Sequence, residues 1–260
     1  MSDPFKYKVN DPYRNRIDYL LIPIDLFGFA LKKKCVNQVK LFIVLKSLYN
    51  DRFPLNKESI ALICSTAKYK SKKTFYTNLK WLVSHKWVTF SKEYCVLKGF
   101  NKLRVYECFN SRKGVQFTPF YDLDHFRPFV YGAVISYCMK HKWFADRESG
   151  IDKRNPIVRS HCIPVSYDLP LAYLSLVLNI SKATASNYKK LAKNSGYIDY
   201  KKDYEVIENV SPLSYNSYRR YADNDDKHRL RFIKGNLCLQ LSDKITSNMV
   251  VKTKRNLRRK

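Results

Sequence analysis

The sequence predicts an α+β protein made of two copies of one small module. The first observation is an internal repeat: moved forward by 110 positions, residues 54–96 align with residues 164–206 without a gap, and nine of the 43 positions are identical. The second is that each copy has apolar residues at helical spacing, followed by short β-rich stretches. A period of this length is typical of a small domain rather than a solenoid repeat, so we infer a tandem duplication.

The length and composition are compatible with two modest hydrophobic cores. The chain has 260 residues, of which 45% are hydrophobic. The identical positions of the repeat are Pro54/Pro164, Ser65/Ser175, Ser71/Ser181, Lys72/Lys182, Thr74/Thr184, Lys80/Lys190, Lys92/Lys202, Tyr94/Tyr204 and Val96/Val206.

An apolar segment and a first helix are expected at the start of the first copy. Residues 18–29 form an apolar run interrupted by Pro23, which predicts an edge strand or a docking arm. From Asn37 to a stop at Asn50 and Asp51, apolar residues recur at helical spacing and predict a helix with one buried stripe. The stripe consists of Val39, Phe42, Ile43, Leu45 and Leu48.

Two more helices and a hairpin complete the first copy. Asn56 is expected to cap a short helix over residues 58–63, and Ser71 to cap a third helix. Residues 87–90 and 94–97 predict a β-hairpin. The inward face of the third helix is expected to hold Phe75, Leu79, Leu82 and Val83.

The second copy follows a linker. Residues 117–128 lead into a predicted helix over residues 129–143. A polar loop over residues 145–160 comes next, and its length indicates either a function or mobility. Residues 169–178 predict the second helix of this copy.

The third helix of the second copy is expected to begin at the cap Ser181 and to end at Gly196. Residues 197–207 predict a second hairpin, and residues 230–241 one more strand or helix. Residues 252–260 hold six basic residues and predict a disordered cationic arm. The inward residues of this third helix are expected to be Ala185, Tyr188, Leu191 and Ala192.

The predicted order of helix, helix, turn, helix and hairpin resembles the winged helix. Ile22-Pro23 ahead of the first helix, Pro54-x-Asn56 at the start of the second and a Ser/Thr-rich start to the third carry this resemblance. It implies two tandem winged-helix (helix-turn-helix plus β-hairpin wing) domains with basic tails. The expected domains are residues 1–116, an N-terminal arm with the first winged helix, 117–212, a linker with the second, and 213–260, a C-terminal extension.

The charge of the chain predicts a nucleic-acid partner. Forty-nine Lys and Arg residues against 22 Asp and Glu residues give a net charge of +27, which attracts a polyanion. A membrane surface is the second candidate, but no apolar run approaches the roughly 20 residues that span a bilayer. The N-terminal ten residues lack the apolar core of a signal peptide, so we expect a cytoplasmic protein.

Candidate contacts to double-stranded DNA lie on the outward faces of the third helices and on the wings. In a helix-turn-helix this helix enters the major groove, where Lys reads guanine, Asn reads adenine and Ser or Thr contacts bases or phosphates. The alternative is a solvated helix face, but neither helix has an outward carboxylate before its last turn. The candidates are Lys72, Lys73, Tyr76, Thr77, Lys80, Lys92, Lys182, Thr184, Ser186, Asn187, Lys190, Lys193, Lys201 and Lys202.

Metal and cofactor sites are not expected. Seven cysteines without a CxxC pair are typical of reduced thiols in a reducing compartment. Cys138, His141, His161 and Cys162 are zinc-type ligands, but adjacent residues in an extended segment point to opposite faces, so buried thiols with incidental histidines are favoured.

Enzymatic activity is the weaker alternative. Asp122 and Asp124 have the DxD spacing by which primase-like enzymes hold a metal, and on a strand both carboxylates would share one face. No third carboxylate motif or partnering histidine accompanies them, so two linker acids, or a helix cap at Asp124, are favoured over a primase or nuclease. No glycine pattern of a phosphate-binding loop is present.

Two DNA-reading modules in one chain resemble the theta-type replication initiators of plasmids and phages, over about residues 19–208. The resemblance implies a non-catalytic protein that binds origin repeats, recruits the host replication helicase and acts on its own promoter as a homodimer. A transcriptional regulator of a mobile element is the alternative, since it needs the same helices.

Overall fold

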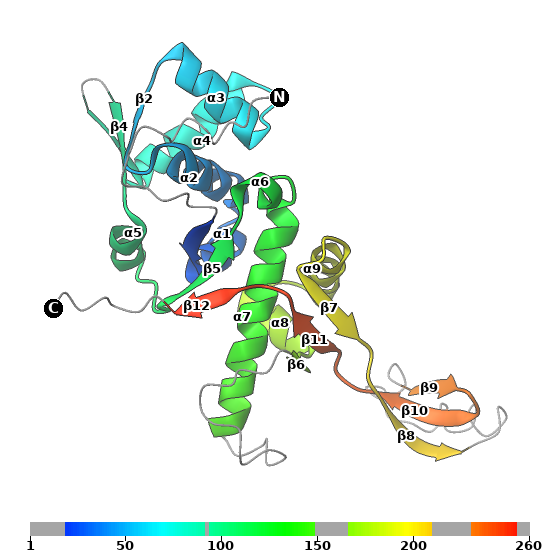
Figure 1. The fold of residues 1–260 in the computed structure, drawn as a ribbon. Helices are drawn as coiled ribbons and strands as arrows, with labels where there is room; N and C mark the ends of the chain where they lie inside the picture. The colour runs from blue at the N-terminus through cyan, green and yellow to red at the C-terminus, as the bar shows by residue number, and fades with distance from the viewer. Residues whose placement is uncertain (1–18, 92–93, 149–165, 210–229, 254–260) are drawn as a thin grey trace. The chain divides into compact units, whose positions relative to one another are not determined.

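The protein is an α+β structure in which helices are combined with small antiparallel sheets, as the sequence predicts (Figure 1). The computed structural model describes residues 19–91, 94–148, 166–209 and 230–253. It divides into two compact units, one formed by Met1–Val134 with Met249–Lys260 and the other by Ile135–Asn248. None of the helices within the described ranges is long and apolar enough to cross a membrane.

The first sheet of unit 1 contains β1 (Leu20–Pro23), β5 (Lys113–Phe117) and β12 (Val251–Thr253), with β5 in the centre. The predicted edge strand is therefore confirmed, but it is shorter than expected. Pro23 occupies the N-cap position of helix α1 (Ile24–Lys32), because its fixed φ of −54° suits the start of a helix. Lys252 was expected in a disordered arm and instead lies in β12, while residues 254–260 fall outside the described residues.

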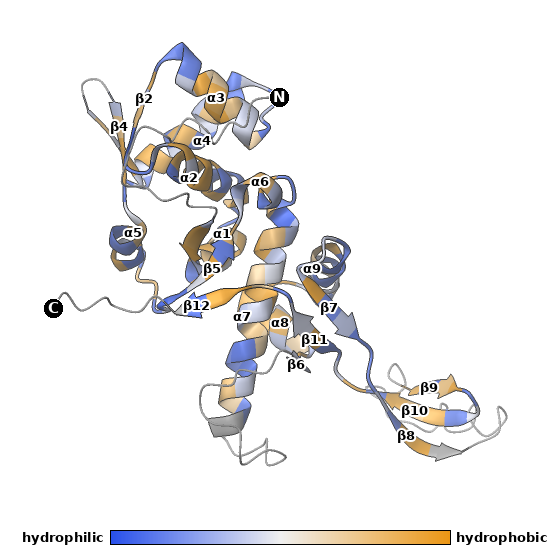
Figure 2. Cartoon of the chain, viewed as in Figure 1, coloured by the Kyte–Doolittle hydropathy of each residue, from blue (hydrophilic) through white to orange (hydrophobic). Residues whose placement is uncertain are grey.

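Helix α2 (Val36–Tyr49) forms the core of unit 1. The predicted stripe is buried, but so are Leu41 and Val44 on the other sides, so that α2 has no solvated face between Leu41 and Leu48. It packs against α1 and the next two helices, and Figure 2 shows it largely in the hydrophobic colour. An apolar helix of this kind must be covered on all sides.

The remainder of the first module follows the predicted order, with one added strand. Asn56 caps α3, its Oδ1 accepting a hydrogen bond of 2.8 Å from the Ser59 backbone N–H. The predicted hairpin is present, and the strand before α3 joins it in a sheet of order β2-β4-β3. The elements are β2 (Arg52–Pro54), α3 (Lys57–Ala67), α4 (Lys72–Ser84), β3 (Val88–Phe90) and β4 (Tyr94–Leu97).

Trp87, which lies between α4 and β3, is fully buried at the meeting point of several elements. Its ring contacts Phe42 of α2 and Trp81 of α4 at centroid distances of 5.2 and 5.4 Å. Its Nε1–H donates a 2.7 Å hydrogen bond to the Glu107 carboxylate, directly after a helix that the sequence did not predict. This helix is α5 (Phe100–Tyr106), and the short α6 (Pro119–Asp122) follows β5.

Unit 2 repeats the helices of the module. The predicted first helix is longer at both ends and includes residues 145–148 of the expected loop, whereas residues 149–160 lie outside the described residues. The third helices correspond residue for residue, because α9 has the bounds of α4 moved by 110 positions. The helices are α7 (Phe126–Glu148), in which the division between the units falls, α8 (Leu171–Leu178) and α9 (Lys182–Asn194).

The prediction of a second hairpin over residues 197–207 is wrong. Strand β7 (Ile198–Lys201) pairs with β11 (Lys244–Ser247) and not with β8 (Tyr204–Asn209). Strands β8, β9 and β10, which lie between β7 and β11 in the sequence, form a second sheet of order β8-β10-β9 that extends from the β6-β11-β7 sheet (Figure 1). A turn with two residues at positive φ, Lys234 and Gly235, joins β9 (Leu230–Ile233) to β10 (Asn236–Gln240), and β6 (Ser166–Asp168) pairs with the other edge of β11.

A buried ion pair ties α9 to the start of β11. Lys189 is only 2% exposed, and its ammonium contacts the Asp243 carboxylate and lies 4.6 Å from the centre of the Tyr200 ring. Burial lowers the pKa of Lys189, and Asp243 opposes that shift. The equivalent residue of the first module is the buried Leu79, so a hydrophobic contact in one module corresponds to an ion pair in the other.

Replacing Asp243 by Asn is expected to lower the free energy of unfolding by about 3 kcal/mol or more, because Lys189 would keep a buried charge without a counter-ion. Urea unfolding followed by circular dichroism measures the loss. The control is Asp199→Asn, which removes the partner of Lys193, another lysine of α9, from an exposed ion pair. This variant should change the urea midpoint little. Equal shifts in the two variants would contradict the structural role of the buried pair.

Candidate nucleic-acid interface

Both third helices begin in the same way. At the end of α3 the Tyr69 and Lys68 backbone N–H groups donate to the carbonyls of Cys64 and Ser65, with Lys68 in the left-handed conformation. Ser71 then caps α4, its Oγ accepting from the Thr74 N–H at 3.3 Å. This reversal of the chain satisfies the free backbone groups at the end of one helix and the start of the next.

The second module repeats this local structure with a turn one residue shorter. Asn179 is the left-handed residue after α8, and its N–H and that of Ile180 donate back to Leu176 and Ser175. Ser181 caps α9, accepting a hydrogen bond of 3.0 Å from the Thr184 N–H. The predicted caps Ser71 and Ser181 are therefore confirmed.

Each third helix also ends in the same way. Lys86 after α4 and Gly196 after α9 both have positive φ, and an aromatic residue that is buried follows each of them. The backbone N–H of this aromatic residue donates to a carbonyl of the helix: Trp87 donates to Leu82, and Tyr197 donates to Ala192. Each third helix is thus held between a serine cap and a buried ring, which fixes which of its faces is exposed.

The exposed face of α4 contains all five residues predicted for it. Phe75, Leu79 and Leu82 are buried on the opposite side, in agreement with prediction, and Val83 is half-buried. Tyr76 is 48% exposed although it is aromatic. The exposed residues are Lys72, Lys73, Tyr76, Thr77 and Lys80.

Tyr69 holds the turn ahead of α4 against its neighbours. Its hydroxyl donates to the Asn37 carbonyl at 3.2 Å, near the start of α2, and accepts from the Asn78 side-chain amide at 3.3 Å. Burial raises the pKa of Tyr69 well above its usual range, so the hydroxyl stays protonated and can donate. The sequence did not single out this contact, because its three residues belong to three different elements.

The exposed face of α9 carries fewer free polar groups than predicted. Lys182, Asn187 and Lys190 are exposed, while Thr184 and Ser186 are half-buried. Lys193 is exposed, but its ammonium forms a 2.7 Å ion pair with Asp199, which raises the pKa of Lys193.

The predicted inward side of α9 needs a correction. Ala185 and Ala192 are buried, but Leu191 is exposed, and Lys189 takes a buried place instead. Lys189 can be buried there because Asp243, which lies far away in the sequence, neutralises it.

The predicted wing residues are placed differently in the two modules. Lys92 lies outside the described residues, in the connection between β3 and β4. Lys201 and Lys202 are exposed, and Lys201 pairs in register with Lys244 of β11. Lys244 is exposed as well and is a basic residue that the sequence analysis missed, because its strand lies 43 positions further along the chain.

The carboxylates considered for metal binding have structural partners. Asp122 lies in α6 and not on a strand, and its Oδ2 accepts a 2.6 Å hydrogen bond from the Thr118 N–H. Asp124 forms an ion pair of 2.5 Å with Lys68. The strand on which the disfavoured metal-binding alternative depended is therefore not present at Asp122.

The zinc-type residues are only partly described. His141 contacts the Tyr137 hydroxyl at 3.0 Å and Cys138 is buried, whereas His161 and Cys162 fall outside the described residues. Within the described ranges no cluster of three or more potential metal ligands occurs.

The electrostatics at the start of these helices are unfavourable to the helices themselves. A helix N-terminus favours acidic residues, yet neither α4 nor α9 has one in its first turn, and both begin with a lysine. An anion placed at these ends would interact favourably with the lysines and with the helix N-terminus.

No protein-family model matches the chain, and neither a curated protein nor a solved structure matches it. The function is therefore inferred from the residues and the geometry described above.

Removing either serine cap is expected to destabilise its module by about 1 kcal/mol, because an N–H in the first turn loses its acceptor. The variants are Ser71→Ala and Ser181→Ala, compared by thermal unfolding. Ser71→Asn and Ser181→Asn serve as controls, since Asn retains a capping oxygen and should restore most of the stability. An Asn variant as unstable as the Ala variant would show that the cap is not the cause.

Proposed function

We propose that the chain is a sequence-specific double-stranded-DNA-binding protein with two modules of the winged-helix type. The observation that carries this proposal is the pair α4 and α9. They have equal length, the same serine cap and the same ending, and both expose lysines at the matched positions Lys72/Lys182 and Lys80/Lys190.

The arrangement of elements supports the winged-helix interpretation. In each module a first helix is followed by a helix-turn-helix and then by β-strands. In the first module the wing is the β3–β4 hairpin. In the second it is the β7–β11 pair with the β8-β10-β9 sheet as an extension.

The exposed side chains suit contacts in the major groove. Lysines reach guanine O6 and N7, Asn187 can pair with adenine, and Thr77 offers a hydroxyl to a base or a phosphate. The first-turn lysines, which disfavour the isolated helix, gain a phosphate partner in such a complex. The net charge of +27 adds attraction that does not depend on sequence.

The biological role that we propose is replication initiation in a plasmid, a phage or another mobile element, without catalysis by this chain and in the cytoplasm. Its further partners would be the host replication helicase and a second copy of the chain. A transcriptional regulator is the alternative, and it needs the same DNA-reading helices. Direct repeats next to the gene, in a region rich in A·T pairs, would favour initiation.

The double variants Lys72→Ala/Lys80→Ala and Lys182→Ala/Lys190→Ala are expected to weaken DNA binding and to leave the melting temperature nearly unchanged. These side chains are exposed, so their removal leaves no cavity. Each variant should lose protection over a different half of a footprint on a site selected from random DNA, because each module occupies its own stretch of groove.

The matched control is Lys32→Ala/Lys33→Ala, which removes the same charge from an exposed part of unit 1. It should leave both halves of the footprint protected. If only one of the two test variants changes the footprint, the model with two DNA-reading helices is wrong.

DNA affinity is expected to fall by about 10³ or more between 50 and 200 mM salt, if roughly 6–10 phosphate contacts release counter-ions. Fluorescence anisotropy with a labelled duplex at several salt concentrations measures the slope. An affinity that hardly depends on salt would contradict the nucleic-acid proposal.

A further inference from the structure

Unit 1 contains a cleft of about 750 Å³ whose lining, within the described residues, includes none of the predicted DNA contacts. One wall is the sheet face that carries Arg52, Thr89 and Val96, three residues in one cross-strand row. Leu20 and Leu21 of β1 and residues 98–102, which lead into α5, provide other walls. The volume is within the range of small-ligand sites.

The cleft is strongly basic. Among the described residues, five cationic side chains line it, against the single carboxylate of Asp51, so this part of the lining has a net charge of +4. The cationic residues are Lys46, Arg52, Lys86, Lys98 and Lys102.

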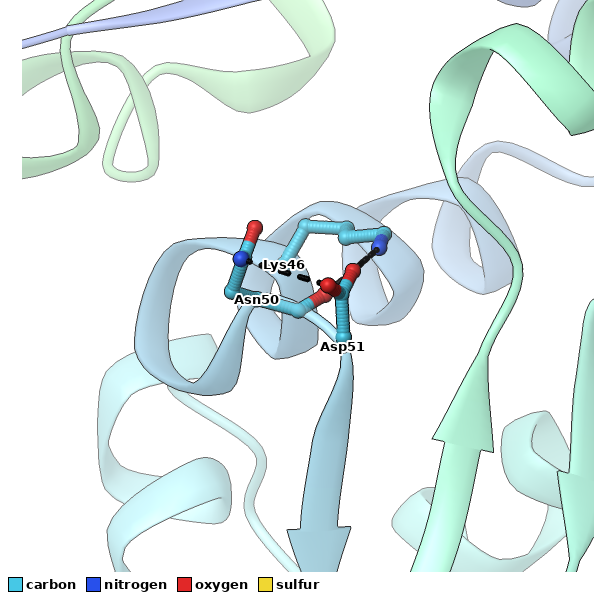
Figure 3. A network of polar contacts seen from close by, with 3 residues as sticks. All are labelled: Lys46, Asn50 and Asp51. Carbon is cyan, nitrogen blue, oxygen red and sulfur yellow. Dashed lines mark hydrogen bonds and ion pairs between the residues drawn. The ribbon is translucent and has the colours of Figure 1, made fainter.

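Asp51, the carboxylate that the described residues contribute to the lining, already has a cationic partner. The ammonium of Lys46, which is 4% exposed, lies 3.1 Å from Asp51 Oδ1 and donates to the Asn50 carbonyl at 2.5 Å (Figure 3). Glu107, whose charge raises the pKa of Lys98, accepts a hydrogen bond from the Trp87 indole N–H. Asp51 therefore neutralises Lys46. Among the described residues of the lining, no further carboxylate is available to the other four cations.

Two of these cations lie against aromatic rings, and Lys86 and Lys98 repel each other. The Lys98 ammonium lies 3.4 Å from the centre of the Tyr106 ring, and the Arg52 guanidinium lies 5.0 Å from that of Tyr94. Burial lowers the pKa of Lys98, Glu107 opposes that shift, and the neighbouring charge of Lys86 adds to the lowering. An anion bound between them would relieve this repulsion.

Lys86 occupies a backbone position that does not favour lysine. Its φ is +58°, in the left-handed region that favours glycine, and the second module has Gly196 at the equivalent position. The first module therefore has a cationic side chain in the cleft where the second has glycine, although lysines also adopt the left-handed conformation at Lys34, Lys68 and Lys234.

We propose that this cleft is a second anion site, which binds the phosphoryl groups of a nucleotide or of a single nucleic-acid strand through Arg52, Lys86, Lys98 and Lys102. The site is independent of the exposed face of α4, because the two share no residue. Planar Arg52 can hold two phosphoryl oxygens, while the lysines act as point charges around them. This inference does not depend on the proposed reading of duplex DNA.

The test is the binding of tripolyphosphate and of a short single-stranded oligothymidylate to the full chain, measured by calorimetry at fixed salt. Lys98→Gln/Lys102→Gln should weaken binding at least tenfold. Lys32→Gln/Lys33→Gln, which removes the same charge outside the cleft, should weaken it less than threefold. Lys72→Ala/Lys80→Ala should weaken it far less than Lys98→Gln/Lys102→Gln does, which separates this site from the α4 face.

A second pair of variants distinguishes a loss of ligand binding from a loss of protein stability. Lys86→Gly should weaken tripolyphosphate binding severalfold while the melting temperature stays the same or rises. Lys34→Gly makes the same change at an exposed residue with φ +54° outside the cleft and should leave binding unchanged.

The two probes distinguish the sources of the phosphoryl group. Oligothymidylate that competes with tripolyphosphate indicates a nucleic-acid strand, and tripolyphosphate that binds alone indicates a free nucleotide. If neither probe binds, or if the control variants lose as much affinity as the cleft variants, the proposal is wrong.

Discussion

The burial of Trp87 is the interaction on which the first module depends. Its ring packs against α2 and α4, its backbone N–H donates to Leu82 at the end of α4, and its carbonyl accepts from Lys98 after β4. The indole N–H reaches Glu107 beyond α5. One residue therefore fixes the orientation of α4, the start of the sheet and the position of residues 98–102. The exposed face of α4 and the basic cleft are both consequences of this packing.

The second module has the same arrangement of helices as the first, but different buried residues hold it together. Tyr197 replaces Trp87 as the buried ring, while Lys189 with Asp243 replaces the buried Leu79. A leucine needs only apolar neighbours, whereas a buried lysine needs a carboxylate at one particular place. The α9 helix is therefore coupled to the strand β11, which comes from much later in the chain. This coupling explains how the module tolerates a long insertion after β7.

Lysines occupy several positions in this protein where they do not favour folding. They begin α4 and α9, they lie in the left-handed region at Lys86, and they are buried at Lys46 and Lys189. The two buried lysines, Lys46 and Lys189, form ion pairs with Asp51 and Asp243, so their role is structural. The exposed lysines that begin α4 and α9 have a local cost to their helices, which agrees with the proposed binding of a polyanion.

The sequence alone determined the local features. Apolar spacing, Asn56, Ser71 and Ser181 identified helices and their starts, because caps and periodicity act within a few residues. The repeat identified α4 and α9 as equivalent, and the exposed lysines followed from the helical period.

Only the tertiary structure decided what depends on distant partners. Strand β11 begins 43 positions after β7 ends, and it pairs with β6 on its other edge and is joined to α9 through the Lys189–Asp243 ion pair. The cleft joins residues from β1, β2, β4 and the approach to α5, none of which share a motif. The sequence specified the exposed face of α4, because a helix face follows from short-range periodicity. The buried place of Lys189 on α9, the strand pairing and the cleft required long-range packing that no local pattern contains.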